Sequence, residues 1–522
     1  MNLGSLLERV ARLYPNKIGV VCGEHRFTYR DFVKRVFRLA AVLQEEGIKK
    51  GDRVAIYHQN CHYFLEAYFA AAVTGAILCP LNYRLSAREI AFILEDTGAV
   101  ALIAQPRFYP LIKEAIGRLD RPLRTYWTGK ESVPAGETNL EAFLVPGADP
   151  PGEVEIGEDD VAHLYYTSGT TGRQKGVMLT HRNVAYHSLG TIAELKMTDE
   201  DVWLHAAPMF HLADAWATWA VTWVGGTHVM VPEFSPGTVI EVMQREKITL
   251  TNMIPTMLNL MVNDPAIQQA AFPSLRLMLS GGAPIAPEVV RKIMEAFDCD
   301  YVQTYGMTET SPYLTMSLLK DSLKSRPQEE QFRFKAATGR PVMFVELKVV
   351  KDDGQEVVWN GKEVGEIVVR GDSVTPGYWH LPEETRGTIR DGWLYTGDLA
   401  VMDEEGYVNI VDRKKDMIVT GGENVYSTEV ENVLYSHPAV LEAAVIGVPD
   451  EKWGEAVHAC VVLKKGMEVS EKELIDFCKE DLARYKAPKS IGFFSALLRT
   501  GSGKIYKKGL SDKYLTQRLM TL

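Results

Sequence analysis

Up to about residue 410, short apolar runs rich in β-forming residues alternate with segments of helix length. Residues 53–57, 100–103 and 275–280 are examples of such runs, and each is followed by a segment long enough for a helix. Strands that alternate with helices are typical of sheets covered by helices, which predicts an α/β fold. The chain has 522 residues, long enough for about two to four domains.

Residues 348–370 differ from this pattern. They hold two strand-like runs around a turn at 352–354, followed by a turn between Gly361 and Gly365. This predicts a small β-rich subdomain. We therefore expect residues 1–411 to form a large N-terminal domain of layered α/β subdomains plus this β-rich subdomain.

The C-terminal part of the chain has the elements of a separate unit. Strands are predicted at 443–446 and 459–463, and helices at 427–435 and 471–482, enough for a compact α+β domain at 417–522. The charged run at 412–416 lies between the two units and is either a solvated linker or a hinge.

The composition excludes several classes of protein. The chain has 68 acidic and 57 basic residues, a net charge of −11, and no basic stripe interleaved with aromatic residues. Nucleic acid is therefore not an expected partner. The six cysteines are scattered and form no C-x-x-C pair, which argues against a disulfide framework or a zinc site and favours a reducing compartment.

The chain also shows no export or membrane signal. Residues 1–10 carry charges where a signal peptide has an apolar core. The most apolar stretch, 63–81, contains Glu66, Gly75 and Pro80, which predicts a buried helix and a strand. We expect a cytoplasmic protein.

Residues 165–176, YYTSGTTGRQKG, are suited to binding phosphate. They follow an apolar strand and precede a helical segment. The glycines permit a tight loop, the hydroxyl groups add to the backbone N–H donors, and Lys175 adds positive charge. The spacing is not that of a P-loop NTPase. The alternative is an ordinary turn rich in Ser and Thr.

Seven further motifs follow this loop. They are PMFH at 208–211, SGGAP at 280–284, QTYGMTE at 303–309, GEIVVRG at 365–371, GWLYTGD at 392–398, DRKKD at 412–416 and GK at 503–504. With these motifs in this order, the chain resembles the acyl-CoA synthetases of the adenylate-forming superfamily over nearly its whole length.

The resemblance implies a reaction in two steps that turns a carboxylate into a CoA thioester. The carboxylate first joins the α-phosphate of ATP, and CoA then displaces AMP. Both partners of the first step are anions, so the site must supply positive charge and aligned donors. The resemblance makes Lys504 the catalytic lysine, places Thr308 on phosphate, and makes Glu309 the ligand of Mg²⁺. Taken alone, Glu309 is equally well explained as a first-turn residue of a helix.

By the same resemblance, several motifs bind ATP and AMP. The residues are Thr167, Ser168, Gly169, Thr170, Thr171, Gly172, Lys175, Gly281, Gly282, Ala283, Tyr305, Gly306, Asp398 and Arg413. Tyr305 offers a flat face to adenine, and the small residues at 281–283 let backbone approach the other face. Asp398 is expected to accept the ribose hydroxyls, helped by Arg413. Alone, Tyr305 is more often a core aromatic and Asp398 a turn residue.

The segment after PMFH matches the family's acyl-pocket helix. The residues assigned to the acyl pocket are His211, Ala213, Trp216, Ala217 and Met307. Helical spacing places Trp216, Trp219 and Trp223 on one face, and such a stripe is more often packed core than a substrate gate. Small residues at 213 and 217 favour a medium- or long-chain fatty acid. The alternative is an aryl or short-chain carboxylate.

The resemblance also assigns a CoA site and a moving domain. The CoA residues are Arg84, Gly421, Gly422, Trp453, Tyr485 and Lys489. Lys415 matches the hinge position, about which the smaller domain rotates between the half-reactions. The segment 482–511 is basic and lacks acidic residues. It is either a solvated face or a surface that meets the polyanions ATP and CoA.

The expected partners are small molecules, namely the carboxylic acid, ATP and CoA, with Mg²⁺ as the cofactor. A homodimer and a peripheral contact with a membrane through the basic segment are both left open. Two further functions are also left open. One is a non-catalytic binding protein that kept the fold, and the other is a luciferase-like oxygenase.

Overall fold

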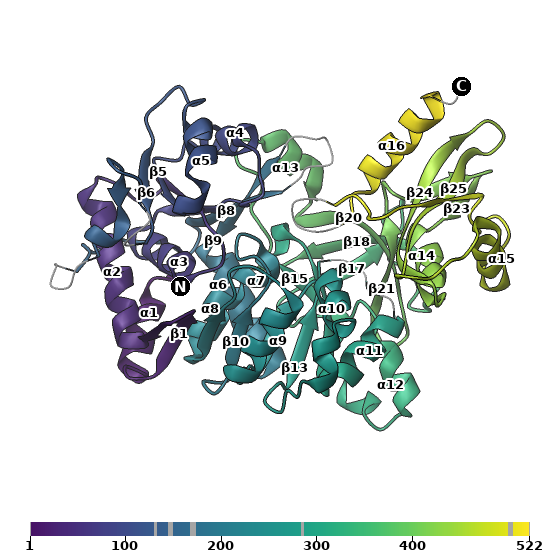
Figure 1. Ribbon diagram of the computed structural model, residues 1–522, viewed down its shortest axis with the longest axis horizontal. Helices are drawn as coiled ribbons and strands as arrows, with labels where there is room; N and C mark the ends of the chain where they lie inside the picture. The colour runs from purple at the N-terminus through teal and green to yellow at the C-terminus, as the bar shows by residue number, and fades with distance from the viewer. Residues whose placement is uncertain are drawn as a thin grey trace.

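The computed structural model describes residues 2–129, 133–144, 150–167, 174–282, 285, 287–499 and 505–520. In these residues the strands form four sheets, three in a large N-terminal domain and one in a smaller C-terminal domain. Figure 1 shows the large domain at the left and centre and the smaller domain at the right. The expected α/β architecture is confirmed.

A seven-stranded sheet with the order β7-β6-β5-β3-β4-β8-β9 holds the first motif. Its strands are parallel except β9, which runs antiparallel to β8. The bounds are β3 Arg53–Tyr57, β4 Ile77–Pro80, β5 Ala101–Ala104, β6 Arg124–Trp127, β7 Thr138–Asn139, β8 Val161–Thr167 and β9 Lys175–Thr180. Strands β3 and β5 confirm the first two predicted runs.

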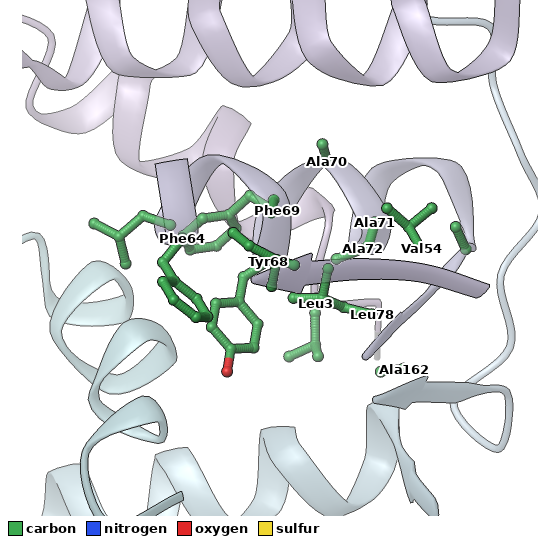
Figure 2. Packing of buried hydrophobic residues seen from close by; sticks show 14 of the residues in the cluster. Leu3, Val54, Phe64, Tyr68, Phe69, Ala70, Ala71, Ala72, Leu78 and Ala162 are labelled. Atoms are coloured by element: carbon green, nitrogen blue, oxygen red, sulfur yellow. The ribbon is translucent and has the colours of Figure 1, made fainter. Parts of the chain in front are cut away.

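Helices cover both faces of this sheet. The helices of this region are α1 Ser5–Leu13, α2 Tyr29–Glu45, α3 His62–Thr74, α4 Ala87–Thr97 and α5 Tyr109–Ile116, with single 3₁₀ turns at Pro106–Phe108 and Leu140–Ala142. α4 and α5 pack on one face and α2 and α3 on the other. Phe64, Tyr68 and Phe69 of α3 belong to the same core cluster as Val54 of β3 and Leu78 of β4 (Figure 2). The predicted buried helix followed by a strand is therefore α3 and β4.

A nine-stranded sheet lies beside the first, with the order β16-β15-β14-β13-β12-β10-β11-β1-β2. Its six central strands are parallel, and β2, β15 and β16 are antiparallel to their neighbours. The bounds are β1 Ile18–Cys22, β2 His25–Thr28, β10 Val202–His205, β11 Thr227–Met230, β12 Leu250–Met253, β13 Leu277–Ser280, β14 Asp300–Gly306, β15 Tyr313–Met316 and β16 Arg340–Pro341.

The helices of this region are α6 His181–Leu195, α7 Leu212–Ala215, α8 Ala217–Val224, α9 Pro236–Arg245, α10 Pro255–Val262, α11 Pro287–Phe297 and α12 Gln328–Lys335, with 3₁₀ turns at Pro265–Gln269, Thr308–Thr310 and Asp321–Leu323. α9, α10 and α11 cover one face of the nine-stranded sheet. α6 and α8 cover the other face.

The expected single face of tryptophans is wrong. The segment after His211 forms two helices, α7 and α8, with Trp216 between them. Trp216 packs against Trp203, with ring centroids 4.9 Å apart, whereas Trp219 packs against Phe69 at 4.7 Å. Both rings are buried, but in different core clusters.

The third sheet has the order β17-β18-β20-β19, with β21 paired to β20. The bounds are β17 Glu346–Val350, β18 Gly365–Arg370, β19 Ile389–Arg390, β20 Trp393–Met402 and β21 Val408–Arg413, and α13 Pro382–Thr388 precedes β19. One expectation is corrected. The run after the turn at 352–354 is not a strand: it forms a single bridge, between Val350 and Glu356, on the edge of β17 away from β18.

The smaller domain has its own sheet, β23-β22-β25-β24 with β26 paired to β25. The bounds are β22 Ile418–Thr420, β23 Glu423–Val425, β24 Val440–Asp450, β25 Gly454–Leu463, β26 Ser490–Phe493, α14 Ser427–Ser436, α15 Glu471–Asp481 and α16 Lys507–Met520. α14 and α15 share one core cluster with the sheet, and α16 contributes to another. The exact limits of the two domains stay a prediction.

A fully buried chain of hydrogen bonds fixes α7 against the nine-stranded sheet. Asp214 of α7 accepts from Trp203 Nε1 at 3.1 Å and from His205 Nδ1 at 2.6 Å. His205 Nε2 lies 3.0 Å from His228 Nδ1, and His228 Nε2 lies 2.9 Å from the hydroxyl of Thr222. Burial lowers the pKa of His228 well below its ordinary value. The chain of hydrogen bonds therefore runs from Thr222 through both histidines to Asp214.

Asp214→Asn replaces one carboxylate oxygen with an NH2 group. This group cannot accept a hydrogen bond from Trp203 Nε1 or His205 Nδ1. We expect Asp214→Asn to lower the free energy of unfolding by about 1–3 kcal/mol, seen as a lower melting temperature in calorimetry. Asp199→Asn is the control, because the Asp199 side chain is 47% exposed. Equal melting temperatures for Asp214→Asn and the wild type would contradict this reading of the chain.

Candidate active site

The ribose end of the expected nucleotide site is assembled from two sheets. The Tyr305 hydroxyl on β14 donates to Asp398 Oδ2 at 2.7 Å. Arg413 Nε lies 3.0 Å from Asp398 Oδ1, and the two residues are partners in the β20–β21 pairing. The Asp398 charge raises the pKa of Arg413, and burial followed by the Asp398 charge raises that of Tyr305. Tyr305 therefore stays a donor.

The phosphate end is built around Glu309. The Tyr378 hydroxyl donates to Glu309 Oε1 at 2.8 Å, and the Thr375 N–H donates to the Glu309 carbonyl at 2.8 Å. Burial and the Glu309 charge raise the pKa of Tyr378, which keeps it protonated. Thr308 and Glu309 are both buried in the 3₁₀ turn after β14.

Lys175 lies at the same end. Its ammonium group pairs with Glu384 and lies 5.4 Å from the centre of the Tyr378 ring. Thr167, at the end of β8, is the register partner of Lys175 in β9. Ser168, Gly169, Thr170, Thr171 and Gly172 of the expected phosphate loop lie outside the described residues, as do Ala283 and Lys504.

Two of the expected glycines have no room for a side chain. A Cβ on Gly281 would overlap the Thr304 hydroxyl, and a Cβ on Gly306 would overlap the carbonyl of Pro312. Gly282 has a φ of +85°, which favours glycine. Backbone at 281 and 306 is thus held close to neighbouring chain.

Part of the expected acyl pocket is present as a pocket beyond the carboxyl ends of β10, β12 and β13. It is lined by Ala207, Pro208, Phe210, His211, Ala213, Ile254 and Gly282. His211 caps α7, since its Nδ1 accepts from the N–H of Ala213 at 3.1 Å. Trp216 and Ala217 are buried in the core cluster beside this pocket, and Met307 packs in the cluster of the third sheet.

Three of the expected CoA residues, Gly421, Trp453 and Lys489, lie together in the smaller domain. The Gly421 N–H donates to the Trp453 carbonyl at 2.8 Å, and Gly421 and Gly422 both have positive φ. Lys489 lies 5.8 Å from the centre of the Trp453 ring. Tyr485 is exposed beside Lys486. Arg84 lies in the large domain, where it stacks on Tyr83.

The expected hinge residue, Lys415, is exposed. The residue before it is tied to the large domain: the Lys414 N–H donates to the Gly397 carbonyl at 2.9 Å, and its ammonium group pairs with Asp352. Asp412, by contrast, accepts the N–H of Ser427 in the smaller domain at 2.6 Å. Bonds to both domains therefore lie within three residues of Lys415.

The sequence motifs did not include Tyr378 or Glu384, which contact Glu309 and Lys175. Both lie between the GEIVVRG and GWLYTGD motifs, in a segment with no pattern of its own. They reach the site because this segment crosses to the first sheet, where the Trp379 N–H donates to the Gly176 carbonyl at 2.8 Å. Only the tertiary structure brings them there.

Comparison with known proteins agrees with this geometry. The model of the AMP-binding enzyme family matches residues 7–379, and that of the AMP-binding enzyme C-terminal domain matches residues 429–504. A feruloyl-CoA synthase of Amycolatopsis sp is 39% identical, covering 97% of each chain. The long-chain-fatty-acid–CoA ligase FadD13 of Mycobacterium tuberculosis is 37% identical, covering 98% of each chain. The crystal structure of ATP-bound MatB from Rhodopseudomonas palustris superposes with a TM-score of 0.87 at 30% identity, covering 98% of this chain and 99% of that chain.

The fold and the family match define an ATP-dependent CoA ligase, an acid–thiol ligase with small-molecule substrates. The chain belongs to the AMP-binding enzyme family and, within it, to the acyl-CoA synthetases. Within the described residues, no helix is long and apolar enough to cross a bilayer.

If Asp398 contacts the ribose, its loss must weaken nucleotide binding. We expect Asp398→Ala to raise the Kd of AMP about 10- to 100-fold, because bonds from both the ribose and Arg413 are lost. Isothermal titration calorimetry measures this directly. Asp352→Ala is the control, since Asp352 is 92% exposed and pairs with the neighbouring Lys414. A Kd of AMP for Asp398→Ala within twofold of the control value would contradict the assignment of Asp398 to the nucleotide site.

Proposed function

We propose that this acyl-CoA synthetase converts a carboxylic acid, ATP and CoA into acyl-CoA, AMP and pyrophosphate through an acyl-adenylate. One observation supports this most directly. The two ends of the expected nucleotide site follow each other along one stretch of chain, from Tyr305 with its Asp398 and Arg413 partners to Glu309 with Tyr378. The pocket at His211 includes Gly282, a residue of the same expected nucleotide site.

In this mechanism the chain supplies fixed charges and donors. Asp398 holds the ribose, Tyr305 lies against the adenine, and Lys175 and Thr308 contact the phosphates. Lys504 bridges the carboxylate and the α-phosphate and offsets the repulsion between them.

The residues present fit one Mg²⁺ ion bound together with ATP. Glu309 is a buried carboxylate oriented by Tyr378, and no cluster of three or more His, Cys, Asp or Glu suited to a metal occurs among the described residues. Mg²⁺ typically takes one or two carboxylates and completes its shell with phosphates and water. Glu309 would hold the ion, which neutralises phosphate charge when bound.

For the acid, the first candidate is a medium- or long-chain fatty acid. The small Ala213 on the pocket wall supports it, as does the similarity to FadD13. The second candidate is an aryl or short-chain carboxylate, supported by the similarity to a feruloyl-CoA synthase. Gly421, Gly422, Trp453, Tyr485, Lys489 and Arg84 are proposed to bind CoA, with rotation about Lys415.

The reaction is tested by pyrophosphate release with Mg·ATP across straight-chain, branched and aromatic acids. We expect release to depend on the acid and to fall by at least about 100-fold in Lys504→Ala, because the charge that offsets the repulsion between two anions is lost. Lys508→Ala is a matched control. If ATP binds but no acid supports release, the protein is a binding protein and the proposal fails.

The hinge assignment has its own test. Lys415→Pro fixes φ at this position. We expect acyl-adenylate formation to stay within about threefold of the wild type and thioester formation to fall more than about tenfold, because only the second step needs the domain to rotate. Single-turnover assays of each half-reaction measure this, with Lys415→Ala as the control. An equal loss in both half-reactions would contradict the assignment of Lys415 as the hinge residue.

A further inference from the structure

A group of buried polar side chains lies beside the acyl pocket, and we call Trp216, Asn252, Thr304 and Tyr313 the polar layer. Each of the last three lies next to a residue of the expected site. The Asn252 amide donates to the Ala213 carbonyl. The Thr304 hydroxyl lies against the position of a Cβ on Gly281, and Tyr313 pairs with Gly306 across β14 and β15.

The strand register places the polar layer on one face of the nine-stranded sheet. Asn252 pairs with Leu279, and Leu279 pairs with Val302, so their side chains share a face. Thr304 follows Val302 by two residues on that face. Trp216 and Tyr313 pack in the core cluster on the same face, with ring centroids 5.2 Å apart. The polar layer is therefore one group at the carboxyl ends of parallel strands, where ligands bind in such sheets.

Three members of the polar layer have an atom with no hydrogen-bond partner in the described part of the chain. These atoms are Asn252 Oδ1, Trp216 Nε1 and the Tyr313 hydroxyl, on side chains that are 0%, 1% and 3% exposed. The Tyr313 hydroxyl lies near Thr304 and Trp216, and these contacts offset part of the rise in its pKa that burial causes. At hydrogen-bond distance and angle it has no partner among the described residues. Buried polar groups in proteins are nearly always paired with another protein group or with ordered water, so three such atoms in one cluster mark a place for a water molecule or for a polar group of a ligand.

The three atoms match one kind of chemical group. Asn252 Oδ1 accepts, Trp216 Nε1 donates, and the Tyr313 hydroxyl does either. A hydroxyl or carbonyl group of a bound molecule can satisfy them, whereas a methyl group leaves them unpaired. A site built for a hydroxyl discriminates strongly against the analogue that lacks it, because its own polar groups are then left buried and unpaired.

We propose that the polar layer selects carboxylic acids that carry a hydroxyl or carbonyl group remote from the carboxylate, over acids of equal length that end in hydrocarbon. This inference rests on the proposed function. Within each of the two candidate classes of acid, the aliphatic and the aryl, it favours the acids that carry a hydroxyl or carbonyl group in addition to the carboxylate.

Two matched pairs of acids test the proposal in the full-length protein. They are 4-hydroxycinnamic acid against 4-methylcinnamic acid and 8-hydroxyoctanoic acid against nonanoic acid, compared by kcat/KM for pyrophosphate release. We expect the hydroxy acid to be favoured at least about tenfold in one pair. Equal use of both members in each pair, or a preference for the hydrocarbon acid, overturns the inference and leaves the proposed function standing. Release with none of the four acids, nor with a wider panel, overturns the proposed function itself.

Tyr313→Phe tests whether the polar layer causes the preference. We expect kcat/KM to fall at least about fivefold more for the hydroxy acid than for its hydrocarbon partner, with an unchanged or higher melting temperature, since an unpaired buried hydroxyl has been removed. Tyr126→Phe is the matched control, because the Tyr126 hydroxyl is also buried without a partner in the described residues but lies on β6 of the first sheet. It should keep the preference. An equal fall for both acids in Tyr313→Phe means that Tyr313 only packs, and the inference fails.

Discussion

The bonds that join Tyr305, Asp398 and Arg413 hold the candidate site together. Asp398 is 4% exposed, and a carboxylate at such a position is costly unless it is paired and hydrogen-bonded. Arg413 supplies the charge from the neighbouring strand, and Tyr305 supplies a hydroxyl from the nine-stranded sheet. The same three side chains therefore satisfy a buried charge, fix the third sheet against the second, and define one end of the site.

The segment between β18 and α13 joins the phosphate end of the candidate site to the rest of the large domain. Its backbone bonds reach the first sheet and α6, since the Met178 N–H donates to the Gly377 carbonyl at 3.1 Å and the Asn183 amide donates to the Val374 carbonyl at 2.9 Å. Through Thr375 and Tyr378 it also reaches Glu309. Three sheets thus meet at the 3₁₀ turn that carries Thr308 and Glu309. Glu309 can be buried in this turn because the Tyr378 hydroxyl pairs with its carboxylate.

Local sequence patterns predicted much of the fold and some of the site. The alternation of strands and helices was correct at β3 and β13, and α3 was correctly read as a buried helix. The motifs named Tyr305, Asp398 and Arg413, which the structure brings within hydrogen-bond distance. Tyr378 was missed, as were Asn252 and Tyr313 of the polar layer, because their contacts join residues far apart in the sequence. The tryptophan face failed because Trp216, between the short helices α7 and α8, packs in a different core cluster from Trp219.

The central claim is that the acid is activated on ATP before CoA takes part. Isotope exchange between labelled pyrophosphate and ATP, with an accepted acid present and CoA absent, tests this most directly. The account predicts exchange that requires the acid and proceeds without CoA, because the acyl-adenylate forms reversibly in the first step. Exchange that appears only when CoA is added would contradict a separate adenylation step.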